Sequence, residues 1–465
     1  MKILLVLSLL IPILFLNIIT GGGDNIRAES EINQIIRQMS LEEKIGQLFM
    51  VGFPGSDVDE NIKNMIEEYH VGGIIYFRRN IDSLNQVTDL CRELQKSSFT
   101  SSELPLLIAT DQEGGIVSRL KGGTHFPGNM SLGATRSQDL AFKAGKATGR
   151  ELKYTGINMN LAPVLDVNNN PDNPVIGVRS FGEDPELVAD LGTAYMEGLQ
   201  SEGVIATGKH FPGHGDTAVD SHLNLPVIEH DRERLNKVEL YPFQEAINQN
   251  IDSIMTAHVH FPAIESEPEI PATLSEKVLN GLLREEMNFQ GVIITDCMEM
   301  SAIADSSGTV EGAVKTLQAG SDLVLISHTY EKQVQAIQGV IKAVKESRIS
   351  EKSIDNSLKR ILELKEKRMG LDSERFDKNM KKNKLNPELN REIAQKIAEK
   401  GITLAKDEEL IPVKNIENKD IAVINFESSV NSQVEDDTNY NNIFTERLSP
   451  GTNSVTPFSV NEEKP

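Results

Sequence analysis

Cysteine is scarce in this chain. Only Cys91 and Cys297 occur among 465 residues. Two cysteines cannot organise a fold of this size through disulfides, even in a compartment that would permit them. No cysteine stands directly after the apolar run near the N-terminus either. The usual route of lipid attachment to an exported protein is therefore excluded.

Positive charge is also in short supply. The chain holds 47 Lys and Arg against 69 Asp and Glu, which gives a formal net charge of −22 and an isoelectric point near 4.9. This balance argues against nucleic-acid partners and against binding of an anionic membrane surface by charge. We expect instead a neutral substrate, or one held by a few local cations. An apolar content of 39% supports a large core.

Two common catalytic motifs are missing. No G-x-S-x-G occurs, which argues against a serine hydrolase. The residues from Gly203 to Lys209 fit the start of a phosphate-binding loop, but His210 stands where that motif requires Ser or Thr. The intervening Val-Ile-Ala-Thr also resembles a strand more than a glycine-rich turn. The sequence therefore argues against nucleotide binding.

The N-terminus carries an apolar run. Met1-Lys2 is followed by apolar residues from Ile3 to Ile19 and then by a short glycine-rich stretch. This layout is typical of an export signal, so we expect residues 1–28 to be a signal peptide and the protein to be secreted or associated with the cell wall. The run is slightly long for a signal, and an uncleaved membrane anchor is the alternative.

From about Glu31 onward, short β-rich runs alternate with longer charged segments of helical character. Eight such pairs predict an α/β fold, a (β/α)8 TIM-type barrel, as the catalytic domain over residues 31–370. The predicted strands are 47–53, 73–77, 106–110, 158–167, 204–209, 253–258, 292–296 and 323–327. The predicted helices include 58–69, 83–96, 139–155, 186–202, 232–250, 276–287 and 309–319.

Polar residues gather where the predicted strands end. Asp111, Asp166, Lys209, His258 and Asp296 each stand at the end of a different strand. Barrel enzymes build their sites from these carboxyl ends. A doubly wound open sheet would also alternate strands and helices, but it would concentrate its polar loops near one crossover. The spread around the whole ring favours the barrel.

The composition changes after about Met369. Residues 371–386 are rich in Lys and Asp with little periodicity, which predicts a linker. A helix is expected over 387–400, followed by strands at 401–405 and 421–424. Beyond Asn425 the sequence is polar and is expected to be poorly ordered. Residues 387–465 therefore predict a short, incomplete α/β segment with a disordered tail.

The segment from Lys209 to His222 holds three histidines, two aspartates and a lysine around a Pro-Gly turn. Asp220 and His222 stand two residues apart, and an aspartate-paired histidine transfers protons near neutral pH. Asp296 follows an apolar strand, where it could simply cap the next helix. A carboxylate that faces a proton donor across a substrate is, however, the arrangement that glycoside cleavage needs.

A metal site is an alternative interpretation of the histidines. Barrel hydrolases use histidine and aspartate ligands at strand ends. Against this interpretation, the sequence offers no tight pair on the first strand, and His258-Val259-His260 is the nearest candidate. The ligands would come from His210, His214, His222, His258 and His260 with Asp216 or Asp220.

Five motifs together resemble the β-N-acetylglucosaminidase branch of family 3 glycoside hydrolases. The motifs occur in the family's order and cover about residues 31–370. They are Ala109-Thr110-Asp111-Gln112-Glu113-Gly114-Gly115, Ala162-Pro163-Val164-Leu165-Asp166, Arg179-Ser180-Phe181-Gly182, Lys209-His210-Phe211-Pro212-Gly213-His214-Gly215 with Asp220-Ser221-His222, and Thr295-Asp296.

The resemblance implies a role for each matching residue. Asp296 matches the nucleophile, whose covalent glycosyl intermediate leads to retention of configuration, and His222 matches the general acid/base with Asp220 as its partner. No metal or cofactor is implied. Bidentate arginines and a buried aspartate suit fixed hydroxyl geometry. The residues that match sugar-binding positions are Asp111, Arg119, Arg179, Lys209 and His210.

We therefore expect an exported exo-β-N-acetylglucosaminidase that acts on a small saccharide or a muropeptide. No nucleic-acid partner is expected, and contact with a membrane is expected only through an uncleaved N-terminal segment. A β-glucosidase or a glycoside phosphorylase on the same barrel is one alternative. A non-catalytic saccharide-binding protein of the cell wall is another, motivated by the short C-terminal unit. The oligomeric state and the choice between muropeptides and chitooligosaccharides stay open.

Overall fold

A computed structural model describes residues 31–221, 224–379, 385–407, 415, 418, 420–427 and 454–461. The apolar N-terminal run, predicted as a signal or an anchor, lies outside these residues, and so does His222. Within the described residues, no helix combines the length and the apolar character needed to cross a bilayer.

Eight parallel strands form one sheet in the order β10-β1-β2-β3-β6-β7-β8-β9. A parallel bridge between Ile294 and Leu323 then joins β9 to the residue before β10, so the sheet closes on itself. The predicted barrel is confirmed. The strands are β1 (Phe49–Val51), β2 (Gly73–Tyr76), β3 (Leu107–Thr110), β6 (Met159–Asn160), β7 (Ile205–Phe211), β8 (Ser253–Thr256), β9 (Val292–Thr295) and β10 (Val324–Ile326).

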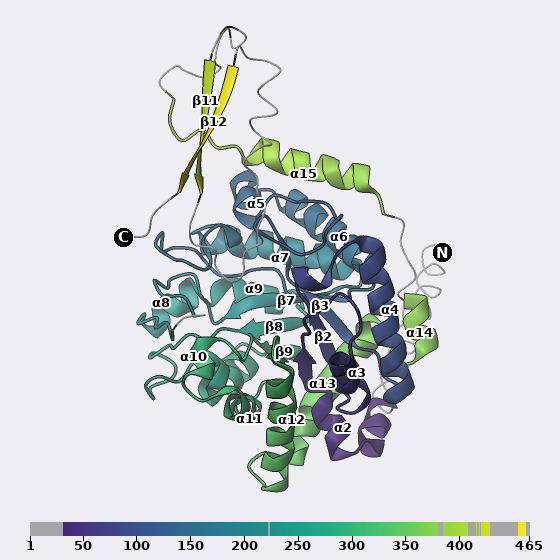
Figure 1. The fold of residues 1–465 in the computed structure, drawn as a ribbon. Coiled ribbons are helices and arrows are strands. Elements are labelled where there is room, and N and C mark those ends of the chain that lie inside the picture. The colour runs from purple at the N-terminus through teal and green to yellow at the C-terminus, as the bar shows by residue number, and fades with distance from the viewer. Residues whose placement is uncertain are drawn as a thin grey trace, which may run out of the picture.

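The strands are buried along their whole length because helices surround the sheet (Figure 1). This explains why they read as continuous apolar runs without alternation. The fourth strand is shorter than the predicted 158–167. Beyond Asn160, the pairing with β7 continues through a backbone hydrogen bond from Thr207 to Ala162 and an isolated bridge between Val164 and Lys209. Pro163 lies between the two and has no N–H to donate to a neighbouring strand.

Helices cover the outside of the barrel, and most of them begin at a capping side chain, such as Asp59 before α3 and Ser83 before α4. They are α2 (Leu41–Gly46), α3 (Glu60–Glu67), α4 (Leu84–Ser101), α5 (Asn129–Thr135), α6 (Gln138–Thr155), α7 (Pro185–Ser201), α8 (Arg232–Lys237), α9 (Tyr241–Asn248), η4 (Lys277–Glu286), α10 (Ser301–Ala304), α11 (Thr309–Ala319), α12 (Tyr330–Lys345) and α13 (Glu351–Arg368).

The single helix predicted over 232–250 is wrong, because α8 and α9 divide this segment. Pro242 lies in the first turn of α9. Proline is tolerated there but not inside a helix, so the chain has to break before it.

The C-terminal segment differs from the prediction in three places. Helix α14 (Ser373–Asn379) lies inside the predicted linker. Residues 402–407 form no strand, and Ile402 and Leu404 are 80% and 63% exposed. The strand predicted at 421–424 belongs to β11 (Asp420–Glu427), which pairs in parallel with β12 (Ser454–Asn461), a strand that was not predicted. A strand needs a partner for its backbone groups, and residues 402–407 have none in the described structure.

The predicted helix over 387–400 is confirmed as α15 (Pro387–Gly401), which packs on α5 and α6 (Figure 1). Ile393 and Ile397 on α15 are buried in this contact. The side-chain amide of Asn390 also donates to Glu151 of α6 at 2.7 Å. The helix is therefore attached to the barrel by both apolar and polar contacts.

Lys365 on α13 is fully buried, and its Nζ donates to Oε1 of Gln47 at 2.8 Å. Burial lowers the pKa of Lys365 to about 7. A lysine in the unfolded chain titrates near 10.4, so between these values the unfolded chain binds a proton that the folded chain lacks. Stability should therefore rise with pH from about 7 to 10, and the full cost of the buried charge is present below pH 7.

We expect Lys365→Met to raise the melting temperature at pH 6 by roughly 2–4 °C, because it removes a buried charge without a counter-ion. The gain should shrink towards pH 9. Lys352→Met on the exposed face of the same helix is the control. Thermal unfolding followed by circular dichroism at both pH values tests this. If the melting temperatures of wild type and Lys365→Met change with pH in the same way, Lys365 is already neutral at pH 6.

Candidate active site

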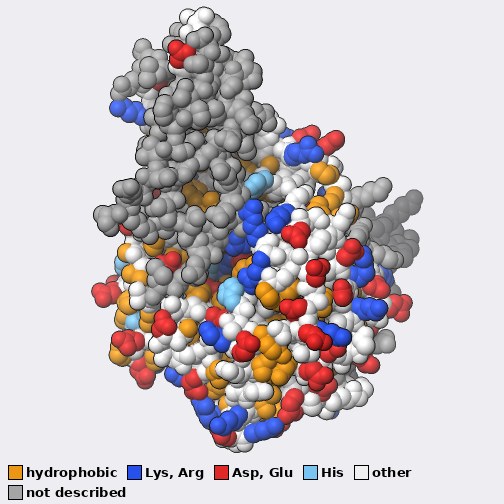
Figure 2. Space-filling view, in the orientation of Figure 1, with side chains coloured by type: hydrophobic (Ala, Val, Ile, Leu, Met, Phe, Trp, Pro, Cys, Tyr) orange, Lys and Arg blue, Asp and Glu red, His pale blue; other side chains and the backbone are white. Residues whose placement is uncertain are grey.

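A cavity of about 230 Å³ opens at the carboxyl ends of the barrel strands. Most of the predicted site residues line it, namely Asp111, Arg119, Arg179, Lys209, His210 and Asp296. Asp220 is not among the described residues that line it, although its neighbour Ser221 is. Figure 2 shows Lys and Arg side chains together with histidines near the middle of one face of this acidic protein.

Lys209 connects two carboxylates at the floor of this cavity. It belongs to β7, and its Nζ lies 2.6 Å from Asp111 and 2.7 Å from Glu113. Glu113 also receives a bidentate pair of hydrogen bonds from Arg179, at 2.9 Å from Nε and 2.8 Å from the terminal nitrogen. Two cations and two carboxylates therefore form one buried network whose formal charges cancel.

The electrostatics keep this network ionised. Burial alone would raise the pKa of Glu113, but the charges of Arg179 and Lys209 lower it far below its ordinary range. Burial would likewise lower the pKa of Lys209, but Asp111 and Glu113 raise it. Charge-assisted hydrogen bonds of this kind fix the side chains in one geometry. The cavity therefore presents a rigid set of donors and acceptors.

A hairpin of two short strands, β4 (Gln112–Gly114) and β5 (Val117–Ser118), supports the next part of the site. The Gln112 side chain accepts from the backbone N–H of Arg119 at 2.8 Å. Arg119 is only 6% exposed and reaches the cavity. The hairpin also turns Glu113 inwards, towards Arg179 and Lys209.

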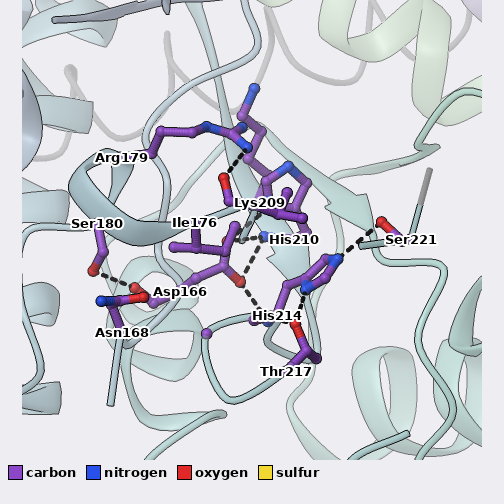
Figure 3. Close-up of polar contacts among 12 residues, drawn as sticks. Asp166, Asn168, Ile176, Arg179, Ser180, Lys209, His210, His214, Thr217 and Ser221 are labelled. Carbon is purple, nitrogen blue, oxygen red and sulfur yellow. Dashed lines mark hydrogen bonds and ion pairs between the residues drawn. The ribbon is translucent and has the colours of Figure 1, made fainter. Parts of the chain in front are cut away.

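Asp166 organises the start of the loop that follows β7 (Figure 3). This fully buried carboxylate lies 2.7 Å from Nδ1 of His210 and accepts from the backbone N–H of His214 at 2.7 Å. Burial would raise the pKa of Asp166, but His210 lowers it. A charged Asp166 therefore fixes the ring of His210 at the cavity wall.

His214 lies deeper in the same loop. Its ring nitrogens lie 2.9 Å from the hydroxyls of Thr217 and Ser221 (Figure 3). Burial, with a further contribution from His210, lowers the pKa of His214 to about 4. The ring is thus neutral at neutral pH, and both its nitrogens are used in holding the loop. His214 therefore belongs to the architecture of the loop.

Asp296 follows β9 directly, and its Oδ1 accepts from the backbone N–H of Cys297 at 2.7 Å. It reaches the cavity from the side opposite to β3, the strand that Asp111 follows. The neighbouring Cys297 is no candidate nucleophile, because burial raises the pKa of its thiol to about 11. Asp296 therefore presents a carboxylate to the cavity at the end of β9.

The described histidines among the candidate metal ligands do not form one group. His258 lies 2.8 Å from Thr273 and 2.9 Å from the carbonyl of Cys297, and His260 lies 2.8 Å from the carbonyl of Ile270. In the part of the chain that the structure describes, the one group with metal-ligand spacing is Asp216, His230 and Glu239. The guanidinium of Arg234 already lies against both carboxylates of that group.

The sequence model described as the Glycosyl hydrolase family 3 N terminal domain matches residues 40–364. The chain belongs to glycosyl hydrolase family 3. The predicted family is thereby confirmed, and the match falls within the predicted barrel.

Several members of family 3 are similar to the chain. Beta-hexosaminidase A of Pseudoalteromonas piscicida is 39% identical over 66% of this chain and 55% of its own length. The chain thus spans little more than half of that relative. A beta-hexosaminidase of Nitrosomonas eutropha is 35% identical over 64% of this chain and 87% of its own length. A solved family 3 beta-N-acetylglucosaminidase from a Paenibacillus species is 45% identical, with a TM-score of 0.84 over 91% of this chain and 80% of its own.

Some residues of this family 3 site were not predicted individually. Glu113 and Asp166 stand inside the motifs quoted above but were assigned no role. The wall formed after β2, β9 and β10 was missed as well, and it consists of Phe77, Arg79, Glu299 and His328. Arg79 lies 4.4 Å over the ring of Phe77. The Arg-Arg pair at 78–79, directly after a predicted strand, was the available signal.

Proposed function

We propose that this protein is a retaining exo-β-N-acetylglucosaminidase that removes a terminal β-linked GlcNAc from short saccharides. The observation that carries the proposal is the convergence of Asp111, Arg119, Arg179, Lys209, His210 and Asp296 on one cavity. These side chains come from distant parts of the sequence, and each matches a family 3 position. Their gathering supports a role in one binding and catalytic step.

The charged network supports sugar binding. Hydroxyl groups donate and accept hydrogen bonds, and an ionised array of Asp111, Lys209 and Arg179 offers both functions in a fixed arrangement. The cavity volume of about 230 Å³ is small, below the roughly 300–1,000 Å³ common for drug-sized ligands. This size favours a single terminal residue over an internal stretch of a long glycan.

The proposed chemistry has two steps. In the first, a carboxylate oxygen of Asp296 attacks the anomeric carbon while the glycosidic bond breaks, and the leaving oxygen takes a proton from His222. In the second, water attacks the anomeric carbon, the bond to Asp296 breaks, and His222 regains a proton from that water. A histidine with its ordinary pKa of about 6.5 can serve both steps near neutral pH, with Asp220 orienting the ring.

The natural substrate is proposed to lie outside the cytoplasm. The apolar N-terminal run supports export, and the net charge of −22 favours a neutral saccharide over a strongly anionic polymer. Short peptidoglycan fragments and chitooligosaccharides both carry such a terminal GlcNAc. The printed names of the relatives, beta-hexosaminidase and beta-N-acetylglucosaminidase, support the same class.

Release of nitrophenol from the β-GlcNAc and β-glucose aryl glycosides tests the proposal. We expect kcat/KM to be at least about 100-fold higher for the GlcNAc substrate, since a site built to bond the acetamide loses those bonds with glucose. Equal or higher activity on the glucoside would favour a β-glucosidase and reject the proposal. A phosphate requirement with release of a sugar phosphate would indicate a phosphorylase. Binding of GlcNAc without turnover would indicate a saccharide-binding protein.

A further inference from the structure

The loop after β7 is held from both sides. It carries Asp220 and His222, the proposed acid/base pair, near the middle of its sequence. On its inner side, the side-chain amide of Asn173 donates to the carbonyls of His214 and Gly215 at 2.8 and 2.9 Å. A Cβ on Gly215 would lie only 1.8 Å from the carbonyl oxygen of Val167. This side of the loop therefore packs directly on the segment after β6.

An ion-pair cluster holds the outer side of the loop. Asp216 lies 2.6 Å from Nε2 of His230, and the guanidinium of Arg234 lies 3.8 Å from Asp216 and 3.2 Å from Glu239. Glu239 is only 3% exposed. A Cβ added to Gly213 would lie 3.0 Å from the Cβ of Glu239. The loop thus lies between the segment after β6 and the cluster.

The start of α8 sets the position of this cluster. Asp231 caps the helix by accepting from the backbone N–H of Arg234 at 2.8 Å. His230 and Arg234 therefore stand on either side of a fixed helix start. None of the four residues of the cluster is among those that line the active-site cavity. Any effect on catalysis has to pass through the loop.

We propose that Asp216, His230, Arg234 and Glu239 are positioning residues that hold the acid/base loop at the distance from the glycosidic oxygen that proton transfer needs. The inference rests on the proposed function, because it takes His222 as the acid. Asp216 is the member of the cluster that stands nearest in the sequence to the acid/base pair. It stands four residues before Asp220. Because the cluster holds Asp216 in place, the short segment from Asp216 to Asp220 has few paths to follow.

The Arg234 guanidinium supplies the positive charge in this cluster. A divalent cation could use Asp216, His230 and Glu239 as ligands, but Arg234 already contacts both carboxylates. The geometry therefore favours a direct ion-pair link between loop and helix. The same geometry predicts that a chelator leaves the activity on the disaccharide unchanged.

The test compares two substrates that differ in their need for an acid. A dinitrophenolate leaves without protonation, whereas the sugar alkoxide released from the GlcNAc disaccharide has to be protonated. We expect His230→Ala to lower kcat/KM for the disaccharide by about 10-fold to 100-fold, because small misplacements of a catalytic group cost this much. The loss on the dinitrophenyl glycoside should stay below about threefold, since its cleavage needs no proton transfer.

Three further variants separate the outcomes. His230→Gln keeps an N–H donor for Asp216 and should retain most of the disaccharide activity. Lys237→Ala removes an exposed 2.6 Å ion pair with Glu233 on the same helix and should have no effect. His222→Ala gives the reference for loss of the acid itself.

The outcomes are distinguishable. His222→Ala could lose more kcat/KM on the disaccharide than on the dinitrophenyl glycoside while His230→Ala does not. The positioning role is then wrong, and the proposed function stands. If His222→Ala shows no difference, the proposed function fails first. Equal losses on both substrates in His230→Ala would indicate a general structural role and overturn the inference. A loss of disaccharide activity after EDTA treatment of the wild type would overturn the ion-pair link in favour of a bound metal.

Discussion

Asp296→Asn is expected to lower kcat on the nitrophenyl GlcNAc glycoside by at least about 10³-fold, because the covalent step loses its nucleophile. The side chain follows β9 and accepts a hydrogen bond from the N–H of Cys297 at 2.7 Å. The amide oxygen of asparagine can accept the same bond. The fold around β9 should therefore survive the change, and circular dichroism should be unaltered.

A rescue experiment gives this prediction a chemical signature. Asp296→Ala leaves a space beside the anomeric carbon, and an azide ion that enters it attacks from the face that the carboxylate used. The product should be the α-glycosyl azide, formed with a single inversion and detectable by NMR. Asp305→Asn, an exposed aspartate nine residues away, is the control. Unchanged turnover in Asp296→Asn, or a β-azide product, would remove Asp296 from the nucleophile role.

The barrel could be predicted from the sequence because its signal is local. Each strand is an apolar run buried on both faces, and each polar residue at a strand end lies at the same end of the barrel. Asp111, Lys209 and Asp296 therefore meet at one cavity, as expected. The residues that hold them in place were less visible. Glu113 lies on a three-residue strand, too short to show a period of two.

Long-range pairing explains the other omissions. Asp216 was considered as a candidate metal ligand, but its partners His230 and Arg234 stand 14 and 18 residues further along the chain, and no local pattern connects them. The strand predicted at 401–405 is wrong for the opposite reason. Its apolar pattern predicts a strand, yet within the described residues no neighbouring strand is present to complete the hydrogen bonds. Local propensity does not reveal whether a partner exists.

Glu113→Gln is expected to destabilise the folded protein by about 3–5 kcal/mol, because it leaves two buried cations with Asp111 as their remaining counter-charge. Arg179 loses its contact with a charged oxygen at 2.8 Å, and Lys209 loses the one at 2.7 Å while it keeps Asp111 at 2.6 Å. The hydroxyl-binding array should loosen as well, so KM for the GlcNAc glycoside should rise. Thermal unfolding and steady-state kinetics at pH 7 measure both effects.

The pH dependence identifies the charge of Glu113 as the cause. Although burial would raise it, the pKa of Glu113 is held far below its ordinary range by Arg179 and Lys209. A glutamate in the unfolded chain titrates near 4.3. The stabilisation by Glu113 is therefore complete above about pH 4.3 and is lost as the pH falls below it towards the folded value. The gap in melting temperature between wild type and Glu113→Gln should be constant from pH 5 to 8 and should narrow towards pH 3.

Glu183→Gln, an exposed glutamate on the loop before α7, is the matched control and should show no gap at any pH. If the gap between wild type and Glu113→Gln is instead the same at pH 3 and pH 7, its cause is the shape of the side chain and not its charge. In that case the array would consist of neutral hydrogen bonds, and the ionised network inferred for the sugar site would be wrong. The melting-temperature gap could also narrow towards pH 3 while KM stays unchanged in Glu113→Gln. In that case Glu113 stabilises the fold through its charge, and sugar binding depends on Asp111 and Lys209.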